Sequence, residues 1–500
     1  MKIDSRTQNA KANIIVGYIS QIGTAIISFI GRKIFLLYLS ADYLGVNGLF
    51  SNILTVLSFA ELGLDSALVY SLYKPVANND TNLVYSLLKY YKKVYRLLAT
   101  VIFIVGVAII PLFKYIINSD LENNQLIIYY LLILSNTVLS YFVADKAAVL
   151  SAFQKQRVQK AVTLLSNLIM QILHIIVLVI WRNYYLYLAS TILSTIIGAV
   201  LLSFAFRRHI PREYQNASIV EFEKRPIIDR VASTFCYKIG AVLVSNTDNI
   251  LISMLVSTLA VGLYSNYYTV TTLAQSFIAI MTTSLMNGIG NFAAKEKKSD
   301  QKQLFDMLLL AYHFIATLGL CGFYNCLDDF IIFWIGNEFV LDKQIVLIIS
   351  INFYQTNILN PVYIFREANG LFSQTKYTMI IRALFNLILS YVLGIKYGIF
   401  GIFLATALSL LFTSFWYEPR LLCKYVFNSS VRVYYAQIIK HFATCCLSFA
   451  TCCLICIFLH GGISVFLLKV ILIMAVNTVL FSVFNFKSRA FRALLRHLHM

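Results

Sequence analysis

Six basic residues of this 500-residue chain lie inside long apolar stretches, and they are the strongest candidates for chemistry: Arg32, Lys33, Lys146, Lys238, Arg382 and Lys469. A charged side chain is costly in hydrocarbon, so it usually has a task there. A buried cation either handles an anionic ligand or neutralises a buried carboxylate. The rest of the sequence indicates which of these roles suits each residue.

Arg32 and the carboxylate of Asp248 are expected at similar depth. Each lies about nine residues before an external turn, which is roughly 13 Å at the helical rise of ~1.5 Å per residue and places both near the membrane midplane. Their helices open the two halves of the chain, so the two charges could meet across a central cleft. We favour substrate or ion handling, with Asp248 as an ion-coupling residue, over a purely structural ion pair between lobes.

The other buried cations have simpler interpretations. Lys33 points about 100° away from Arg32 on the same helix and can reach outward. Lys238 and Arg382 lie in the inner thirds of their helices, where they either line the cytoplasmic mouth of a cavity or reach the headgroups. Lys146 follows Asp145 and is expected to pair locally or reach outward. Lys469, near the outer end of the last helix, is expected to be an interface anchor.

Two carboxylates, Glu61 and Asp65, lie one turn apart on the second helix and share a face. Their expected position near the cytoplasmic surface favours an inner gate that pairs with basic loop residues. Proton or sodium coupling is the alternative role.

Five of the nine cysteines cluster at Cys445, Cys446, Cys452, Cys453 and Cys456. They are interpreted as small packing residues between helices, and no metal site or cofactor is predicted. No Gly-Lys dipeptide exists, so the chain holds no phosphate-cradling P-loop, and it has neither His-Glu-x-x-His nor Gly-x-Ser-x-Gly. Short external gaps also argue against an enzyme.

The elements that position these residues are long helices. With 59% hydrophobic and 13% charged residues, the chain is a membrane protein. Fourteen continuous apolar runs predict transmembrane helices, beginning near Asn13, Tyr43, Val94, Gln125, Val158, Tyr184, Val231, Leu259, Leu304, Gln344, Tyr377, Gly398, Ala436 and Ile463.

The distribution of charge predicts orientation. The gaps after even-numbered runs, with both termini and the flanking helix ends, hold 31 of the 41 Lys and Arg residues, whereas the gaps after odd-numbered runs hold four. Both termini are therefore expected in the cytoplasm. The same rule explains the net charge of +19, so no nucleic-acid partner is expected.

An internal repeat predicts two lobes. Gly48–Val56 and Gly262–Val270 share six of nine residues, and each lies near the start of the second helix of a six-helix block. The predicted parts are an N-terminal lobe at 1–206, a cytoplasmic linker at 207–230 and a C-terminal lobe at 231–432. Residues 433–500 add two further helices and a basic amphipathic tail. Two lobes of parallel topology around a midplane site are a plan seen in secondary transporters.

The sequence resembles bacterial polysaccharide repeat-unit flippases, the capsule and O-antigen transporters of the multidrug/oligosaccharidyl-lipid/polysaccharide exporter superfamily. The likeness spans nearly the whole chain and is carried by the order and spacing of seven stretches: Arg32–Phe35, Tyr43–Asn52, Glu61–Asp65, Asn246–Ser253, Val261–Tyr267, Asn369–Phe372 and Gly398–Thr406.

The resemblance implies a fold like that of the multidrug (MATE) exporters and alternating access. It also implies a bacterial cytoplasmic membrane protein that moves an undecaprenyl-diphosphate-linked oligosaccharide to the outer leaflet. Arg32 would contact the diphosphate, because a guanidinium meets phosphate oxygens with a planar fork, and Lys238 and Arg382 would be secondary cavity cations. The two extra helices, 433–486, would form a groove for the lipid tail.

The implied partners are the lipid-linked oligosaccharide, membrane lipids, and the polymerase and glycosyltransferases of the same pathway. Two alternatives stay open. One is a drug or small-cation exporter of the same fold, in which Asp248 binds the cargo. The other is a membrane polysaccharide polymerase or ligase.

Overall fold

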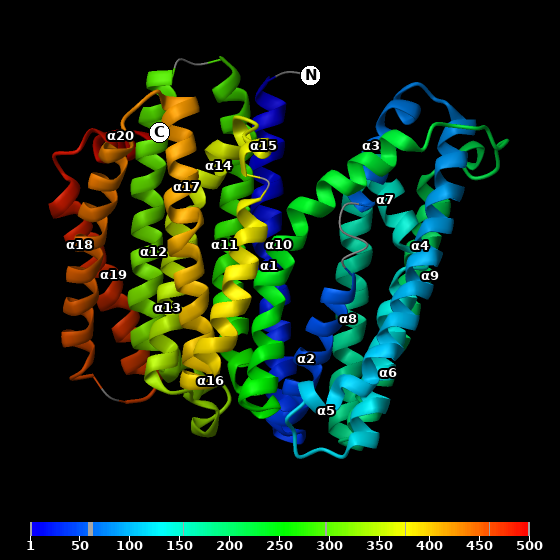
Figure 1. The fold of residues 1–500 in the computed structure, drawn as a ribbon, viewed down its shortest axis with the longest axis horizontal. Coiled ribbons are helices and arrows are strands. Elements are labelled where there is room, and N and C mark those ends of the chain that lie inside the picture. The colour runs from blue at the N-terminus through cyan, green and yellow to red at the C-terminus, as the bar shows by residue number, and fades with distance from the viewer. Residues whose placement is uncertain are drawn as a thin grey trace. The chain divides into compact units, whose positions relative to one another are not determined.

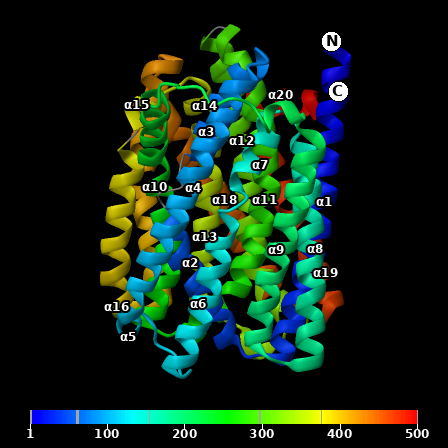
Figure 2. The ribbon, with the colours of Figure 1, turned by 90° about the vertical axis from the view of Figure 1, so that its right-hand side faces the viewer.

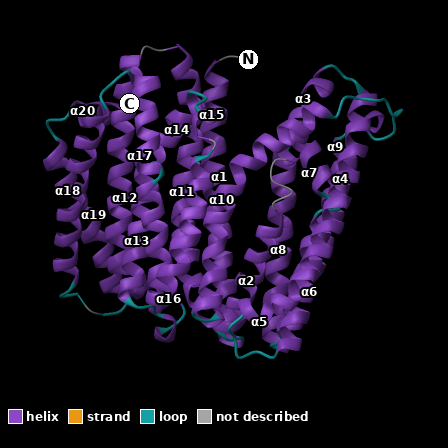
Figure 3. Cartoon of the chain, in the orientation of Figure 1, coloured by secondary structure: helices purple, strands orange, loops and turns teal. Residues whose placement is uncertain are grey.

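A computed structural model describes residues 3–58, 64–153, 155–295, 298–375, 377–459 and 461–498, and helices are the regular structure throughout this part of the chain (Figures 1 and 3). Some side chains within these ranges are not described, among them those of the first twenty residues, Asp65 and Lys238.

Ten segments of the described residues are long and apolar enough to cross a membrane: Gln21–Tyr38, Thr81–Ile116, Asn123–Ala152, Arg157–Trp181, Tyr184–His209, Lys298–Trp334, Lys343–Ala368, Thr378–Phe427, Val431–Cys456 and Ile463–Asn485. The protein is therefore a multi-pass, all-α membrane protein, as the apolar runs predicted.

The remaining expected spans also correspond to helices. The second is formed by α2 (Ala41–Leu57) and α3 (Leu64–Ala77), the seventh by α10 (Arg225–Leu255) and the eighth by α11 (Thr258–Lys295). The eleventh and twelfth lie together in α16 (Thr378–Phe412), which is interrupted at Gly398, where φ is 58° and ψ is −137°. The Asn386 amide donates to the Thr406 hydroxyl at 3.1 Å, so the two arms lie side by side and the chain reverses between them.

The chain divides into two compact units. Unit 2 comprises Ile26–Gly262, and unit 1 comprises Met1–Ala25 together with Leu263–Met500. Within each unit the long helices run side by side (Figures 1 and 2). The predicted lobes, 1–206 and 231–432, were defined by the internal repeat, whereas the two units are defined by packing. The lobe boundaries therefore stay a prediction.

Unit 2 contains the second part of α1 (Ile3–Tyr38), the helices from α2 to α10, and the first turn of α11. Its further helices are α4 (Thr81–Ile109), α5 (Phe113–Ile116), α6 (Asn123–Ser140), α7 (Ala144–Ala152), α8 (Gln156–Trp181) and α9 (Tyr184–His209). α10 packs against α2, α3 and α5. Aromatic residues fill the core, where the ring of Phe113 lies 5.5 Å from Phe50 and 4.8 Å from Tyr130.

Within unit 2, α2 and the start of α11 approach each other without side chains between them. A Cβ atom on Gly45 would lie 1.9 Å from the Thr258 carbonyl oxygen, and one on Gly262 would lie 2.1 Å from the Ala41 carbonyl oxygen. The contact is reciprocal, and each helix contributes a small residue followed four positions later by glycine. Small residues at this spacing let membrane helices touch backbone to backbone.

Unit 1 is built around α12 (Lys298–Trp334), which packs against α13 (Lys343–Ile358), α14 (Asn360–Ala368), α18 (Val431–Cys456), α19 (Ile463–Asn485) and α20 (Arg489–Leu498). The short helices α15 (Phe372–Thr375) and α17 (Ser414–Leu421) and the π-helix η5 (Leu422–Phe427) complete it. The start of α1 and helix α20 lie at the same end of this unit (Figure 1).

The structure corrects one expectation about the buried cations. Lys469 is not an anchor at the interface: its exposure is only 7%, and its ammonium lies 2.6 Å from the Asp329 carboxylate, which joins α19 to α12. Lys146 lies next to the buried Asp145, as expected, and it also donates to the Ser203 hydroxyl at 2.6 Å.

Candidate functional site

Arg32 lies on α1 beside a cluster of aromatic side chains in unit 2. It is half-buried, whereas its neighbour Lys33 is exposed, as the 100° step between them predicted. Arg32 interacts electrostatically with Tyr187. The Tyr187 ring stacks on His174 at 3.9 Å and meets Phe35, one turn beyond Arg32, at 5.1 Å. The guanidinium therefore occupies a partly enclosed, aromatic-rich setting.

The other residues predicted to act with Arg32 are only partly described. Asp248 is half-buried on α10 and belongs to the same compact unit as Arg32, so a pair between them would form within unit 2. Glu61 and the side chains of Asp65 and Lys238 lie outside the described residues. Their roles stay predictions.

Arg382 lies in a buried charged cluster of unit 1 rather than alone. The centre of the cluster is an ion pair in which the Arg366 guanidinium donates to Glu418 at 2.8 Å, with side-chain exposures of 3% and 1%. Glu367 accepts from the same guanidinium at 3.2 Å. Arg382 interacts electrostatically with Glu418 and with Tyr363.

The cluster holds two cations and two anions, so its formal charge is balanced. It ties α14 to α17 and borders α16, the three short or interrupted helices of this region. A ligand anion could pair with one of these guanidinium groups only by weakening its interaction with Glu418, and leaving a buried carboxylate uncompensated is costly. Arg382 is consequently less available to a ligand than its position in the sequence suggested.

Sequence reasoning missed Arg366 and Glu418, although they form the most deeply buried ion pair of the described residues. Arg366 lies near a helix end and was counted with the cytoplasmic basic residues. The available signal was Glu418, a lone carboxylate directly before Pro419 at the end of a long apolar run.

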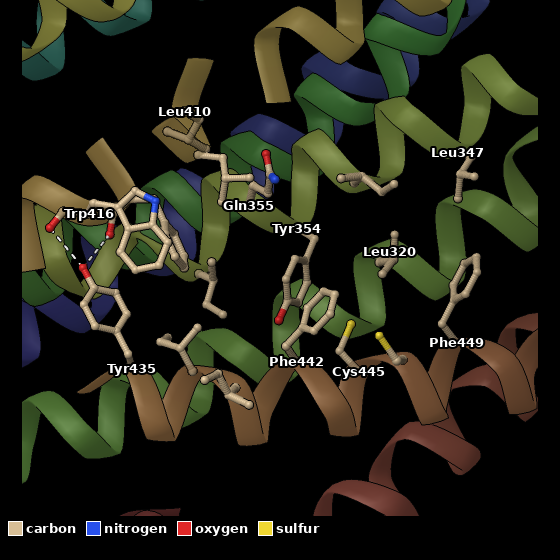
Figure 4. Close-up of a pocket in the computed structure, with 17 residues that line it drawn as sticks. Leu320, Leu347, Tyr354, Gln355, Leu410, Trp416, Tyr435, Phe442, Cys445 and Phe449 are labelled. Carbon is tan, nitrogen blue, oxygen red and sulfur yellow. Dashed lines mark hydrogen bonds between the residues drawn. The ribbon is translucent and has the colours of Figure 1, made fainter. Parts of the chain in front are cut away.

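An apolar cavity of about 550 Å³ opens along α18 in unit 1 (Figure 4). Its walls come from α12, α13, α16, α17 and α18, and the lining residues are almost all aliphatic or aromatic: Leu320, Leu347, Ile351, Tyr354, Gln355, Ile358, Leu410, Leu411, Phe415, Trp416, Tyr435, Ile438, Ile439, Phe442, Cys445, Cys446 and Phe449. We call this cavity the apolar groove.

The contribution of α18 to the groove is a single stripe. Tyr435, Ile438, Phe442, Cys445 and Phe449 recur at intervals of three and four residues, as the successive positions of one helix face do. From first to last the stripe is about 21 Å long at 1.5 Å per residue.

The groove is open to the surface of the unit. Ile439 and Phe442 line it, yet they are 68% and 57% exposed. In a membrane protein such a face meets hydrocarbon, so the groove is suited to a lipid chain.

The cysteine cluster has a packing role in the structure. Cys321, Cys326, Cys452 and Cys456 pack with Ile473 between α12, α18 and α19, and Cys445 lies in the main core of unit 1. In the part of the chain that the structure describes, no three His, Cys, Asp or Glu side chains are grouped so that they could hold a metal ion. His441 stacks on His313 at 4.5 Å, a pairing that the sequence did not reveal.

Solved structures share this fold. An inward-facing multidrug resistance MATE transporter matches with a TM-score of 0.67 and 12% identity, over 81% of this chain and 98% of that one. The lipid II flippase MurJ, in an inward closed conformation, matches with a TM-score of 0.67 and 16% identity, over 94% and 99%. The MATE transporter VcmN of Vibrio cholerae matches with a TM-score of 0.54 and 14% identity, over 84% and 100%.

The likeness confirms the MATE-like fold predicted from the sequence. Among curated proteins, none matches the chain significantly. The family model for polysaccharide biosynthesis proteins matches residues 10–286, more than half of the 500 residues, so the chain belongs to the polysaccharide biosynthesis protein family.

Proposed function

We propose that this protein is a secondary transporter that flips an undecaprenyl-diphosphate-linked oligosaccharide repeat unit from the inner to the outer leaflet, for capsule, exopolysaccharide or O-antigen assembly. The observation that carries the proposal is the apolar groove, because a chain of this family with a transporter fold and a surface groove suited to hydrocarbon has the means to hold a lipid-linked cargo. Of the three solved structures named above, two are MATE transporters and one is a lipid flippase; none is an enzyme.

In this proposal Arg32 contacts the diphosphate. Its half-buried guanidinium can form two parallel hydrogen bonds with phosphate oxygens, and the surrounding aromatic rings keep the dielectric low, which strengthens such bonds. Lys238 and Arg382 remain proposed as secondary cations that bind the diphosphate. Arg382 would bind it only if the diphosphate weakens the interaction between Arg382 and Glu418. Asp248 is proposed for ion coupling, and Glu61 with Asp65 for an inner gate.

The proposed location is the cytoplasmic membrane of a bacterium, with both termini in the cytoplasm, because the basic residues collect on that side of the apolar runs. The proposed partners are the lipid-linked oligosaccharide and the polymerase and glycosyltransferases that make and consume it.

A comparison of two matched pairs of variants in a polysaccharide export assay tests the function. In the first pair, Cys446→Trp places an indole in the groove, whereas Leu454→Trp places the same side chain at an exposed position of α18 outside it. We expect the first variant to lower export about tenfold or more, the effect of losing about 1.4 kcal/mol of lipid binding, and the second to leave export unchanged.

In the second pair, Arg32→Ala removes the proposed phosphate contact and Lys33→Ala removes the neighbouring exposed cation. Loss of charge-assisted hydrogen bonds predicts at least a tenfold fall for the first and little change for the second. Full export by inserted Cys446→Trp and Arg32→Ala variants would contradict the proposal. Export of a cationic drug that depends on Asp248 instead would support the exporter alternative.

A further inference from the structure

A second cavity, of about 420 Å³, lies at one end of α18 in unit 1 and has a different character from the apolar groove. Its lining comes from the end of α17, from η5, from the loop that follows η5 and from the first residue of α18: Arg420, Cys423, Lys424, Asn428, Ser429 and Val431. Two of these residues are cations and none is a carboxylate. We call it the cationic pocket.

The local backbone is unusual and explains why a pocket forms there. η5, Leu422–Phe427, is a π-helix, a wider turn that often marks functional positions. It ends at Asn428, which adopts a left-handed conformation with φ 48° and ψ 46°. The chain then enters α18, where Ser430 caps the helix by accepting from the Arg432 amide at 3.3 Å. The helix therefore begins at the pocket, and its N-terminal end favours negative charge.

The charge of the pocket is not neutralised by nearby acids. Among the described residues, neither Arg420 nor Lys424 forms an ion pair, and both are exposed. Asp306, which acts electrostatically on the pocket residue Cys423, is paired with Lys302. Two solvent-accessible cations thus remain available to an anion.

The cationic pocket adjoins the apolar groove through a single residue. Arg420 interacts with the Tyr435 hydroxyl, and the Tyr435 ring lines the groove. That hydroxyl also donates to the Trp416 carbonyl at 3.0 Å, and the two rings lie 4.7 Å apart (Figure 4). Tyrosine and tryptophan favour the level of the membrane headgroups, so this junction fits the boundary between headgroup and hydrocarbon.

We propose that the cationic pocket and the apolar groove form one binding site for a polyprenyl diphosphate, with the diphosphate on Arg420 and Lys424 and the hydrocarbon chain along α18. This inference rests on the proposed function and names the position at which the lipid-linked substrate first docks, before its diphosphate reaches Arg32. A diphosphate carries at least two negative charges, which matches two cations, whereas the phosphodiester of an ordinary phospholipid carries one.

Binding to the purified, full-length protein in zwitterionic nanodiscs tests the site. The probes are a polyprenyl diphosphate, phosphatidylglycerol and inorganic diphosphate. The variants are Arg420→Gln with Lys424→Gln, which removes both charges, Cys446→Trp, which fills the groove, and Lys440→Gln, which removes an exposed charge of α18 outside both cavities.

We expect the double variant and Cys446→Trp each to weaken polyprenyl diphosphate binding roughly tenfold or more, and Lys440→Gln to leave it unchanged. Phosphatidylglycerol should bind more weakly than the diphosphate lipid, and inorganic diphosphate should not compete at equal concentration. Equal affinity for phosphatidylglycerol would overturn the inference in favour of a resident phospholipid. Competition by inorganic diphosphate would overturn it in favour of a simple anion site, and so would unchanged binding by the double variant.

The assay separates this inference from the proposed function. If the variants lose binding but the wild type transports no lipid-linked oligosaccharide, the function fails and the docking site stands. If transport depends on Arg32 but not on Arg420 and Lys424, the docking site fails and the function stands.

Discussion

At the scale of single residues, burial separates basic side chains that look alike in the sequence. Arg366 is 2% exposed, whereas Arg420, also in unit 1, is exposed and lines a cavity. A buried charge must be compensated, and Glu418 supplies the compensation for Arg366. An exposed charge without a carboxylate partner is available for a ligand.

The buried ion pair gives a prediction about stability. Arg366→Met should lower the free energy of unfolding of the detergent-purified protein by about 3–5 kcal/mol, because it leaves Glu418 as an uncompensated buried charge. The change is measured by thermal unfolding. The double variant Arg366→Met with Glu418→Met should recover most of that loss, since it removes both charges and keeps the volume. Glu367→Gln, at a more exposed partner, is the control with little effect. If the double variant is no more stable than Arg366→Met alone, the uncompensated charge of Glu418 is not the cause of the loss.

At the scale of helices, glycine decides where two helices can touch. Gly45 lies where α2 meets the backbone of α11, whereas Gly48, one turn further along α2, has only the Val261 side chain within 4 Å, at 3.6 Å. Gly48 opens the repeated segment Gly48–Val56 and Gly45 precedes it, but nothing in the sequence shows which of the two meets a neighbouring backbone.

The two glycines predict opposite outcomes on substitution. Gly45→Ala forces a Cβ atom into the Thr258 carbonyl and should cost about 1–3 kcal/mol or more, as overpacking does. Gly48→Ala meets an ordinary contact and should be neutral or stabilise α2 by up to about 1 kcal/mol from helix propensity. Thermal unfolding of both purified variants in one detergent checks the difference. A stable Gly45→Ala protein would mean that the helices can separate without cost.

At the scale of the whole molecule, hydropathy predicted the helices but not their partners. The apolar runs predicted the helices and the fold class correctly, because both follow from the bilayer as solvent. The orientation inferred from the basic gaps stays a prediction. The orientation of Lys33 away from Arg32 followed from helix geometry. The apolar groove was expected only as a general property of residues 433–486. In the structure α18 supplies one wall, the other walls come from α12, α13, α16 and α17, and no local pattern reveals which helices will face α18. Lys469 was misjudged for the same reason, since its partner Asp329 lies 140 residues away.

The division into units gives a prediction for the whole chain. A break after Asn216 separates α10 from α2, α3 and α5, the helices it packs against. We expect a fragment of residues 1–216 to be degraded when expressed alone and to be protected when residues 217–500 are expressed with it. An uncut chain with a flexible linker at the same position should fold normally. Stable accumulation of residues 1–216 alone would contradict the importance of α10 for unit 2.

Unit 2 is one continuous stretch of chain, but unit 1 is not, because its first 25 residues precede unit 2 and the rest follow it. The Gln21 amide donates to the Ser276 hydroxyl at 2.9 Å, so the start of α1 packs against residues made some 250 positions later. During translation, unit 2 can therefore be completed while the ribosome is still synthesising unit 1. Helix α1 therefore lacks this partner until more than half a chain later, and part of its final contact surface is exposed to lipid or to a chaperone in the meantime.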